Sequence, residues 1–388
     1  MRILACHNRY AVRGGEDIAF DTAVKLWRGA GHEVRVFERH NARLAQAGVS
    51  ARVSAARRIV HDPTVYAELD ALIGEWRPRI AVVQNTLPLL SLAPYRVFAD
   101  RRVPVVQVVY NYRFLCLNGE LYTAGAICER CTAGNYLHGV LRRCYRGSVL
   151  ESAAVARMAF ANRRGRIWAS TVARFVVPDR FLGQKLAAHG LPDDRFRVIP
   201  NPAELRPLKK PLTHDGTILY VGRWTQGKGV FTLLEAALAA DVPPIVMVTG
   251  EEARAAAAKH PAVRAGRVTL VSGEYGDALH ERMTRVTAVV VPSQWYDNLP
   301  MVISHAFVAG RPVVASRING IPEYVRDGEN GLLVQPGDAS GLARALRTVV
   351  EDRDRWSQMA ECSRAMAEGE LSTDRWTERW NRVFDEAA

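Results

Sequence analysis

The chain has 388 residues, of which 48% are hydrophobic and 24% are charged, and this length and composition indicate two globular domains of ordinary size and exclude a disordered protein. The formal net charge is +12, carried largely by arginine, but the basic clusters lack the interleaved aromatic residues of a base-stacking platform, which argues against nucleic-acid binding. The charge fits either a solvated arginine-rich surface or contact with an anionic membrane surface.

The start of the chain lacks the apolar region of a secretory signal peptide. No apolar run approaches the roughly 18 to 20 residues that span a bilayer. We therefore expect a cytoplasmic protein, either free in the cytoplasm or peripherally associated with the inner face of the membrane.

The first predicted elements are a short apolar strand at Arg2–Cys6, a turn at Gly14 and Gly15, and a helix at Glu16–Ala30 whose apolar residues recur at helical spacing. Further apolar strands are predicted at residues 33–37, 80–83 and 103–109. Runs that are apolar throughout are buried on both faces, so they favour a parallel sheet covered by helices.

Four cysteines follow in a segment that covers residues 114–147, and they are Cys116, Cys128, Cys131 and Cys144. Disulfides are disfavoured in a cytosolic chain, and a Cys-x2-Cys pair flanked by one cysteine on each side has the spacing of a structural tetrathiolate zinc site. An iron–sulfur cluster and unconnected buried or redox-active thiols are alternatives. Four thiolate ligands leave no open position, so we expect no catalytic metal.

Residues 200–211 are rich in proline and predict a linker. Beyond it, strands at 217–221, 245–248, 268–271, 288–291 and 312–315 alternate with helices at 230–240, 252–260, 278–286, 300–309 and 339–351, which is the pattern of a doubly wound domain. The last stretch, 374–388, is amphipathic, with Trp376, Trp380 and Phe384 on one stripe that should be buried against one of the domains.

The predicted fold class is therefore α/β, with two Rossmann-like doubly wound domains facing a central cleft. The first domain covers residues 1–203 and includes the cysteine segment, the second covers 204–370, and residues 371–388 form a helix that packs back on the domains. Ligands of such sheets bind outside the carboxyl ends of the strands, which here would line the cleft.

The segment Pro292–Val334 combines a buried strand, a polar turn at Ser293–Asn298 and a helix with Pro300 at its first position. The free N–H groups at the start of that helix form an anion site that suits a diphosphate.

This segment, PSQWYDNLPMVISHAFVAGRPVVASRINGIPEYVRDGENGLLV, resembles the signature of glycosyltransferase family 4, whose members are retaining enzymes with the GT-B fold. The stretches VGRWTQGKGVFTLLEA, IPNP and HNRYAVRGGED are similar to other elements of the family, so the resemblance covers almost the whole chain. A subset of the family carries a similar cysteine insert. The resemblance implies a nucleotide-sugar donor bound mainly by the second domain and an acceptor bound by the first.

The resemblance assigns catalytic roles to Arg223 and Lys228, which match the cations that grip the donor diphosphate, and to Asp297, at the first acidic position of the signature, where the family usually has Glu. Charge that develops on a leaving diphosphate is stabilised by such cations. The positions that it assigns to donor binding are Gly14, Gly15, Glu274, Tyr275, Asn298, Leu299, Pro300, Met301 and His305. The cleft positions of the first domain, on the acceptor side, are Gln84, Asn85, Tyr110, Asn111 and Arg113.

Besides Asp297, three of these residues differ from the family pattern. His305 stands where relatives have a Glu that accepts hydrogen bonds from the donor ribose, and Gln84 and Tyr110 stand where relatives often have His. An imidazole offers at most one acceptor where a carboxylate offers two oxygens, so donor recognition must differ. An unusual donor sugar, an unusual acceptor or a catalytically silent protein would each account for the changes.

The sequence thus predicts a retaining glycosyltransferase in which the leaving diphosphate itself acts as the base on the same face of the sugar. Its acceptor would be a glycan, a lipid-linked glycan or a small natural product. A non-catalytic binding or partner subunit with the same fold is the alternative. A phosphorylase-like cofactor enzyme is disfavoured, because the chain is short and no long pyridoxal-binding region is evident.

Overall fold

The computed structural model describes residues 1–388 except 47, 209–211, 240 and 273. The chain divides into two units. The first contains Met1–Leu121, Cys128–Pro200 and Thr377–Ala388, and the second contains Tyr122–Ile127 and Asn201–Trp376. The division between Pro200 and Asn201 lies within the predicted linker, close to the predicted end of the first domain at residue 203. Residues 209–211 of that linker lie outside the described residues.

The first unit contains a six-stranded parallel sheet in the order β2-β1-β3-β4-β7-β8. Its strands are β1 (Arg2–Arg9), β2 (Glu33–His40), β3 (Ile80–Val83), β4 (Val105–Val108), β7 (Val172–Val177) and β8 (Phe196–Val198). Ile3, Leu4, Ala5 and Cys6 in β1 have no exposed surface. Strands buried on both faces are typical of a parallel sheet between helical layers, as the sequence predicted.

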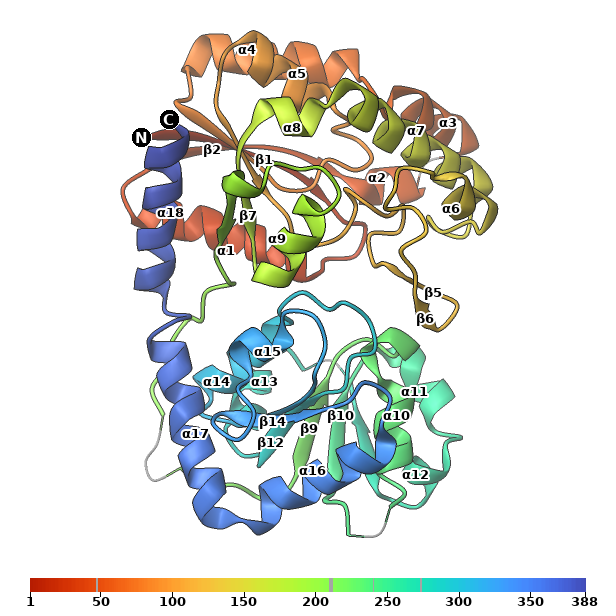
Figure 1. Cartoon of the computed structure of the whole chain (residues 1–388), viewed down its shortest axis with the longest axis vertical. Helices are drawn as coiled ribbons and strands as arrows, with labels where there is room; N and C mark the ends of the chain where they lie inside the picture. The colour runs from red at the N-terminus through yellow and green to blue at the C-terminus, as the bar shows by residue number, and fades with distance from the viewer. Residues whose placement is uncertain (47, 209–211, 240, 273) are drawn as a thin grey trace. The chain divides into compact units, whose positions relative to one another are not determined.

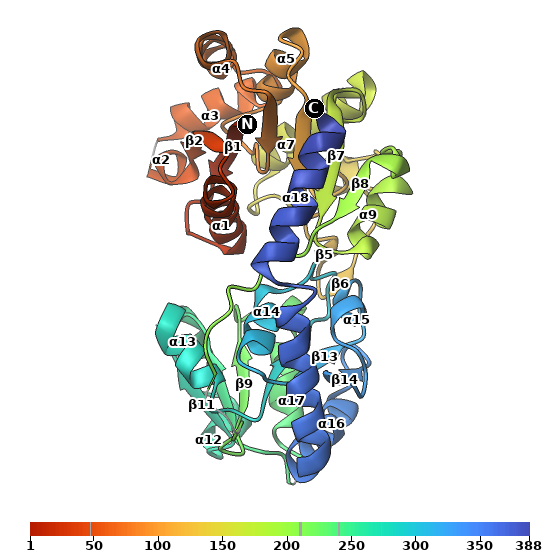
Figure 2. The ribbon, with the colours of Figure 1, turned by 90° about the vertical axis from the view of Figure 1, so that its left-hand side faces the viewer.

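Helices cover this sheet on both faces (Figures 1 and 2). They are α1 (Gly15–Gly29), α2 (Asn41–Gln46), α3 (Val49–Arg58), α4 (Pro63–Trp76), α5 (Ala93–Asp100), α6 (Leu137–Leu141), α7 (Val149–Gly165), α8 (Ile167–Thr171) and α9 (Arg180–Ala187), with a 3-10 turn, η1, at Asp193–Arg195. The start of α4 has a local cause: the Asp62 side chain accepts hydrogen bonds from the backbone N–H groups of Thr64 and Val65, and Pro63 fills the first position.

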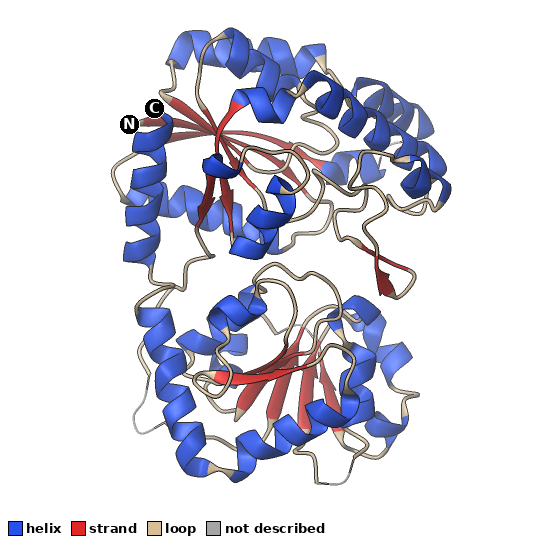
Figure 3. Cartoon of the chain, viewed as in Figure 1, coloured by secondary structure: helices blue, strands red, loops and turns tan. Residues whose placement is uncertain are grey.

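The second unit contains another six-stranded parallel sheet, ordered β11-β10-β9-β12-β13-β14 (Figure 3). Its strands are β9 (Ile218–Val221), β10 (Ile245–Val248), β11 (Val268–Val271), β12 (Ala288–Val291), β13 (Val313–Ser316) and β14 (Gly331–Val334). Its helices are α10 (Val230–Ala236), α11 (Glu251–Ala257), α12 (Pro261–Arg264), α13 (Gly276–Met283), α14 (Met301–Val308), α15 (Ile321–Tyr324), α16 (Ala339–Glu351) and α17 (Arg353–Glu368), with a 3-10 turn, η2, at Gln226–Lys228.

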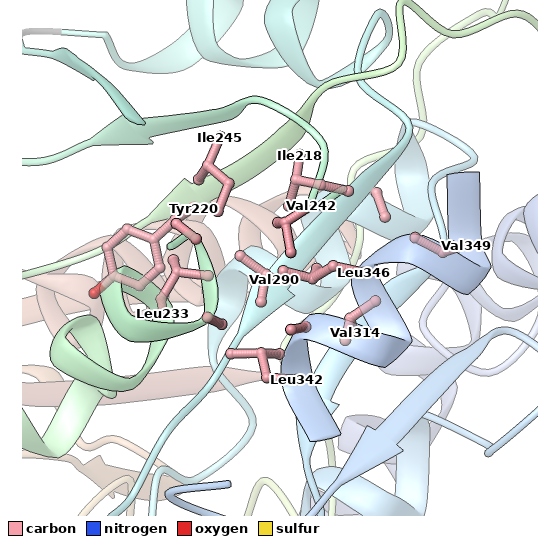
Figure 4. Packing of buried hydrophobic residues seen from close by; sticks show 14 of the residues in the cluster. Ile218, Tyr220, Leu233, Val242, Ile245, Val290, Val314, Leu342, Leu346 and Val349 are labelled. Atoms are coloured by element: carbon pink, nitrogen blue, oxygen red, sulfur yellow. The ribbon is translucent and has the colours of Figure 1, made fainter. Parts of the chain in front are cut away.

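Successive residues of β9 enter different cores. Ile218 and Tyr220 pack with Leu233 of α10 and Leu346 of α16 (Figure 4), whereas Leu219 packs in the cluster of α14 and α17 on the other face. This alternation is the two-residue period of a strand. It places the second sheet between two helical layers and leaves the loops after its strands as the exposed edge. Ala240, the end of one predicted helix, lies outside the described residues.

A short hairpin departs from the predicted domain division. Residues Tyr122–Thr123 (β5) and Ala126–Ile127 (β6) pair antiparallel and group with the second unit, although they lie within the predicted cysteine insert of the first domain. The insert therefore does not belong to one unit throughout.

The C-terminal helix α18 (Thr373–Ala387) joins the first unit from Thr377 onward. The ring of Trp27 in α1 lies 4.8 Å from Trp380 and 5.9 Å from Phe384, both edge-on. Trp376, Trp380 and Phe384 are all buried, which confirms the predicted apolar stripe. Among the described residues, no helix is both long enough and apolar enough to cross a membrane.

Candidate functional site

Several residues predicted to bind the donor or its diphosphate lie on loops that follow the strands of the second sheet. Arg223 and Lys228 follow β9, Glu274 follows β11, and the turn 292–300 follows β12. In a parallel sheet these loops meet at one edge, the position where ligands of doubly wound domains bind.

Lys228 and Asp297 are brought together. The Lys228 ammonium donates a hydrogen bond to Oδ2 of Asp297 over 2.6 Å, and the buried Ser293 hydroxyl donates to the same oxygen over 2.8 Å. Asp297 is 8% exposed. A carboxylate engaged in this way orients the lysine, so Asp297 is a positioning residue rather than a free nucleophile.

Trp295 lies beneath both predicted phosphate-binding cations. The Arg223 guanidinium carbon is 5.3 Å from the centre of the Trp295 ring, and the Lys228 nitrogen is 5.4 Å from it. Such distances allow cation–π attraction. Trp295 was not predicted from the sequence. Its only signal is an indole in an otherwise polar turn.

Gly229 fixes the backbone that carries Lys228. Its φ is +73°, and a Cβ added there would lie 1.7 Å from the carbonyl oxygen of Pro292. The turn after β12 is also tied to η2, because the Gln294 N–H donates to the Gly227 carbonyl over 2.8 Å. Only glycine permits this close approach of the two backbones.

Several buried polar atoms near this edge have no hydrogen-bond partner among the described residues. They are the Thr249 hydroxyl after β10, the Trp295 indole N–H, the Ser304 hydroxyl in α14, and both amide atoms of Asn319 after β13. Buried polar groups are normally satisfied, so these atoms are available to a polar ligand. Thr249, Ser304 and Asn319 were not predicted from the sequence.

The predicted positions at the start of α14 are packed closely. Leu299 and Pro300 are buried, while Asn298 and Met301 are half-buried. Leu299 has a φ of +29°. Pro300 is not the first helical residue, as predicted, but the one before it, because α14 begins at Met301 and Pro300 has an extended ψ of 127°.

His305 is exposed on α14. Desolvation, together with the nearby positive groups of His280 and Arg206, lowers the pKa of His305 below its ordinary value of 6.5. The imidazole is therefore neutral at physiological pH and can accept one hydrogen bond.

Glu274 and Tyr275 differ in their surroundings. The Glu274 carboxylate accepts hydrogen bonds from Nε and Nη2 of Arg282 in α13, and this hydrogen bonding lowers the pKa of Glu274. Tyr275 is 75% exposed and directly precedes α13. The exposed ring is free to stack on a ligand, whereas the glutamate is already occupied by an arginine.

In the first unit, Asp17 holds the glycine loop at the start of α1. Its carboxylate accepts hydrogen bonds from the Gly14 N–H over 3.1 Å and from the Tyr10 N–H over 3.3 Å, and its Oδ1 lies 2.8 Å from Nε2 of His7. A Cβ at Gly14 would meet nothing within 4 Å. Gly14 is thus the N-cap of α1 and Gly15 its first residue, with open space beside the Gly14 Cα.

The predicted cleft residues of the first unit line one cavity of about 30 Å³. They are Gln84, Asn85, Tyr110, Asn111 and Arg113. Gln84 directly follows β3 and Tyr110 comes shortly after β4, so both lie at carboxyl ends of strands, as predicted.

Glu16 joins this cavity and was missed. Its carboxylate accepts hydrogen bonds from the Asn111 amide over 2.6 Å and the Tyr10 hydroxyl over 2.8 Å. The Arg113 guanidinium donates to Asn85 over 3.0 Å. Burial alone would lower the pKa of Arg113, but Tyr10 and Glu16 raise it. The cavity is therefore lined by a linked set of charged and amide groups that can form hydrogen bonds with hydroxyl groups.

The four insert cysteines are free thiols of the first unit, with Cys116 and Cys131 buried. Burial, and then the charges of Cys116, Cys144 and Cys128, raise the pKa of Cys131 to about 11. Backbone N–H groups of residues 118–121 also point to Cys116.

This chemistry fits a thiolate-binding metal. Among the described residues, however, no group of three or more Cys, His, Asp or Glu side chains has metal-site spacing, so the zinc site stays a prediction.

Known proteins match both units. Residues 14–202 match the family model described as "Glycosyl transferase 4-like domain", and residues 215–352 match "Glycosyl transferases group 1". A lipopolysaccharide core biosynthesis glycosyltransferase of Rhizobium meliloti is 32% identical over 174 residues, which are 43% of this chain and 49% of that protein. The chain thus spans about half the length of this curated relative.

Solved structures share the fold over nearly the full length. An Anabaena protein in complex with UDP aligns with a TM-score of 0.67 and 16% identity over 99% of this chain and 100% of that one. Sucrose-phosphate synthase from Thermosynechococcus elongatus aligns with a TM-score of 0.70 and 17% identity over 99% and 98%. The chain is therefore of the GT-B glycosyltransferase type, with a glycosyl transferase 4-like domain followed by a group 1 glycosyl transferase domain.

Proposed function

We propose that this protein is a retaining glycosyltransferase that moves a sugar from a nucleotide-diphosphate sugar to a glycan, lipid-linked or small-molecule acceptor. The observation that carries the proposal is the placement of Arg223 and Lys228 over the Trp295 ring at the carboxyl edge of the second sheet. Cations held at that edge suit a diphosphate whose charge grows as the glycosidic bond breaks.

The surrounding groups support the same ligand. The start of α14 presents backbone N–H groups, the unpartnered Thr249, Ser304 and Asn319 atoms lie nearby in the fold, and phosphate or ribose oxygens would satisfy such donors. In the reaction, the bond from the anomeric carbon to the diphosphate breaks, the acceptor oxygen bonds to the same face of that carbon, and its proton passes to the diphosphate. Asp297 keeps Lys228 in place during this step.

The comparisons favour two details of the substrate. One structural neighbour was solved with UDP, which supports a uridine donor. The relative from Rhizobium meliloti builds a lipopolysaccharide core, which supports a cell-surface glycan as the acceptor. The polar groups around Glu16 would contact acceptor hydroxyl groups, since hydroxyls can bind to carboxylate, amide and guanidinium groups together.

The proposal is tested by UDP-glucose hydrolysis and by thermal melting with UDP. Arg223→Ala and Lys228→Ala should each reduce turnover by about 10²- to 10³-fold while the fold is retained, although Lys228→Ala should also lower the melting temperature because the buried Asp297 loses its counter-charge. Arg285→Ala, which removes an exposed arginine paired with Glu281, is the matched control and should be silent. No stabilisation by any nucleotide diphosphate would instead indicate the non-catalytic binding or partner subunit.

We also propose that Cys116, Cys128, Cys131 and Cys144 hold one structural zinc ion, which would cross-link the insert. Elemental analysis should find close to one zinc per chain, and Cys128→Ser should lose the metal and lower the melting temperature. Cys362→Ser, at an exposed thiol outside the insert, should change neither. Iron in place of zinc, or unchanged stability of Cys128→Ser, would contradict the proposal.

A further inference from the structure

The first unit carries an unusually apolar exposed surface, which we call the α6–α7 face. It is formed by α6, the turn 142–148 and the outer side of α7 (Figure 1). Its large exposed side chains are Leu137 at 61%, Leu141 at 71%, Leu150 at 76% and Phe160 at 56%. Each of these leaves more than half of its surface in water, where apolar contact area is unfavourable.

These side chains share one face because of helical spacing. Leu137 and Leu141 are four residues apart on α6, and Leu150, Arg157 and Arg164 recur every seventh residue along α7. Leu137, Arg157 and Phe160 line one shallow hollow between the two helices. The opposite side of α7, with Val155 and Met158, is buried in the unit.

The same face is strongly basic. Residues 137–166 contain seven arginines and one acidic residue, Glu151, and so account for half of the net charge of +12. Among the residues that the structure describes, no carboxylate lies within ion-pair distance of Arg142, Arg143, Arg146 or Arg164. This contrasts with arginines elsewhere, such as Arg101, which pairs with Asp70 over 2.5 Å.

A neighbouring helix extends the charge. The Arg157 guanidinium donates to the backbone carbonyls of Ala56 and Arg57 at the end of α3, over 2.6 and 2.7 Å. α3 adds Arg52, Arg57 and Arg58 and contains no acidic residue. Arg58 lies 4.0 Å from Asp62, at the limit of an ion pair.

We propose that the α6–α7 face docks this protein on an anionic membrane surface. Leucine and phenylalanine side chains would enter the boundary between headgroups and acyl chains, and the arginines around them would meet lipid phosphates. A purely apolar partner would leave the arginines without counter-charges. A nucleic acid would leave the leucines in water. An anionic membrane surface offers both an apolar region for the exposed leucines and phenylalanine and phosphates for the unpaired arginines.

The test is co-sedimentation of the full chain with vesicles of equal phosphatidylglycerol and phosphatidylethanolamine, compared with pure phosphatidylcholine vesicles. We expect binding to the anionic vesicles only, weakened by salt. Arg142→Gln with Arg143→Gln should reduce the partition coefficient about thirtyfold, and Leu141→Ser with Leu150→Ser about tenfold or more. All four positions are exposed, so the melting temperature should not change.

Matched controls lie in the second unit. Arg264→Gln with Arg344→Gln removes the same charge from exposed positions, and Leu238→Ser removes a leucine that is 49% exposed. Both controls should bind like the parent protein. The proposal is wrong if the parent does not bind anionic vesicles, if it binds phosphatidylcholine equally, or if the arginine variants alone lose binding, which would indicate a polyanion site without lipid insertion. The assay needs no sugar transfer, so its outcome is independent of the proposed enzymatic activity.

Discussion

His305 is a neutral imidazole in positive surroundings, with His280 and Arg206 close enough to lower its pKa. We predict that His305→Ala weakens UDP binding several-fold, because one hydrogen bond of about 0.5–1.5 kcal/mol is lost. His305→Glu should retain or improve binding, since a carboxylate offers two acceptor oxygens and the neighbouring cations stabilise its charge. Calorimetry of UDP with the three proteins decides this. Equal affinities in all three would show that His305 does not touch the donor.

His7 is fully buried and stacks on Phe20 at 4.6 Å. Burial lowers the pKa of His7 below 6.5 although Asp17 raises it in part. The unfolded chain therefore binds a proton more readily than the folded one, so stability should fall as pH decreases from the ordinary value of 6.5 toward the lowered pKa.

We expect His7→Gln to be less stable than the parent at neutral pH but to lose less stability on acidification, because it has no group to protonate. Urea unfolding between about pH 7 and pH 5 measures both slopes. Parallel slopes for the two proteins would mean that other histidines cause the dependence.

At the scale of single residues, the charged side chains of a known motif could be predicted from the sequence. Residues whose role depends on contacts formed only in the fold were missed. Arg223, Lys228 and Asp297 stand in a recognisable motif. Glu16 could not be predicted, because its partner Asn111 is 95 residues away in the chain. The place of Trp295 depends on two loops that meet only in the folded sheet.

The loop between β9 and α10 depends on one glycine. We predict that Gly229→Ala costs about 1–3 kcal/mol more than Gly216→Ala, because the new Cβ would overlap the Pro292 carbonyl oxygen. Gly216 has a similar φ of +84° but open space around it, so its substitution should cost only the left-handed strain of about 1–2 kcal/mol.

Denaturant midpoints of the two glycine variants measure this difference. UDP binding adds a second readout, since displacement of Gly229 would move Lys228. Equal stability of the two variants would show that the turn after β12 relaxes freely.

At the scale of elements, the alternation of strands and helices in the second unit was largely predictable, because each strand is a short apolar run and each helix is amphipathic. β7 was missed because Arg174 interrupts its apolar pattern, although the half-buried arginine pairs with Glu386 of α18. β14 was missed because its residues, Gly331–Val334, were interpreted only as part of a motif.

At the scale of the whole molecule, the first unit includes most of α18, which follows the second unit in the chain. We predict that Trp380→Ala lowers the free energy of unfolding of the first unit by about 3–5 kcal/mol, because the contact with Trp27 and Phe384 is lost. Arg382→Ala on the same helix removes an exposed pair with Glu378 and should cost less than about 1 kcal/mol. Hydrogen exchange in β1 and α1 reports the loss locally, and a Trp380→Ala protein with unchanged exchange would contradict the expected role of α18.

The division of the first unit over three stretches of chain has a consequence during synthesis. The strands of its sheet are complete once Val198 has been made, but Trp27 has no cover from Trp380 until α18 has left the ribosome. At about 5–20 residues per second, the second unit separates these events by roughly 10–40 s. For that time the Trp27 indole lacks its contacts with α18, so the second unit can finish folding before the first, although it is translated later.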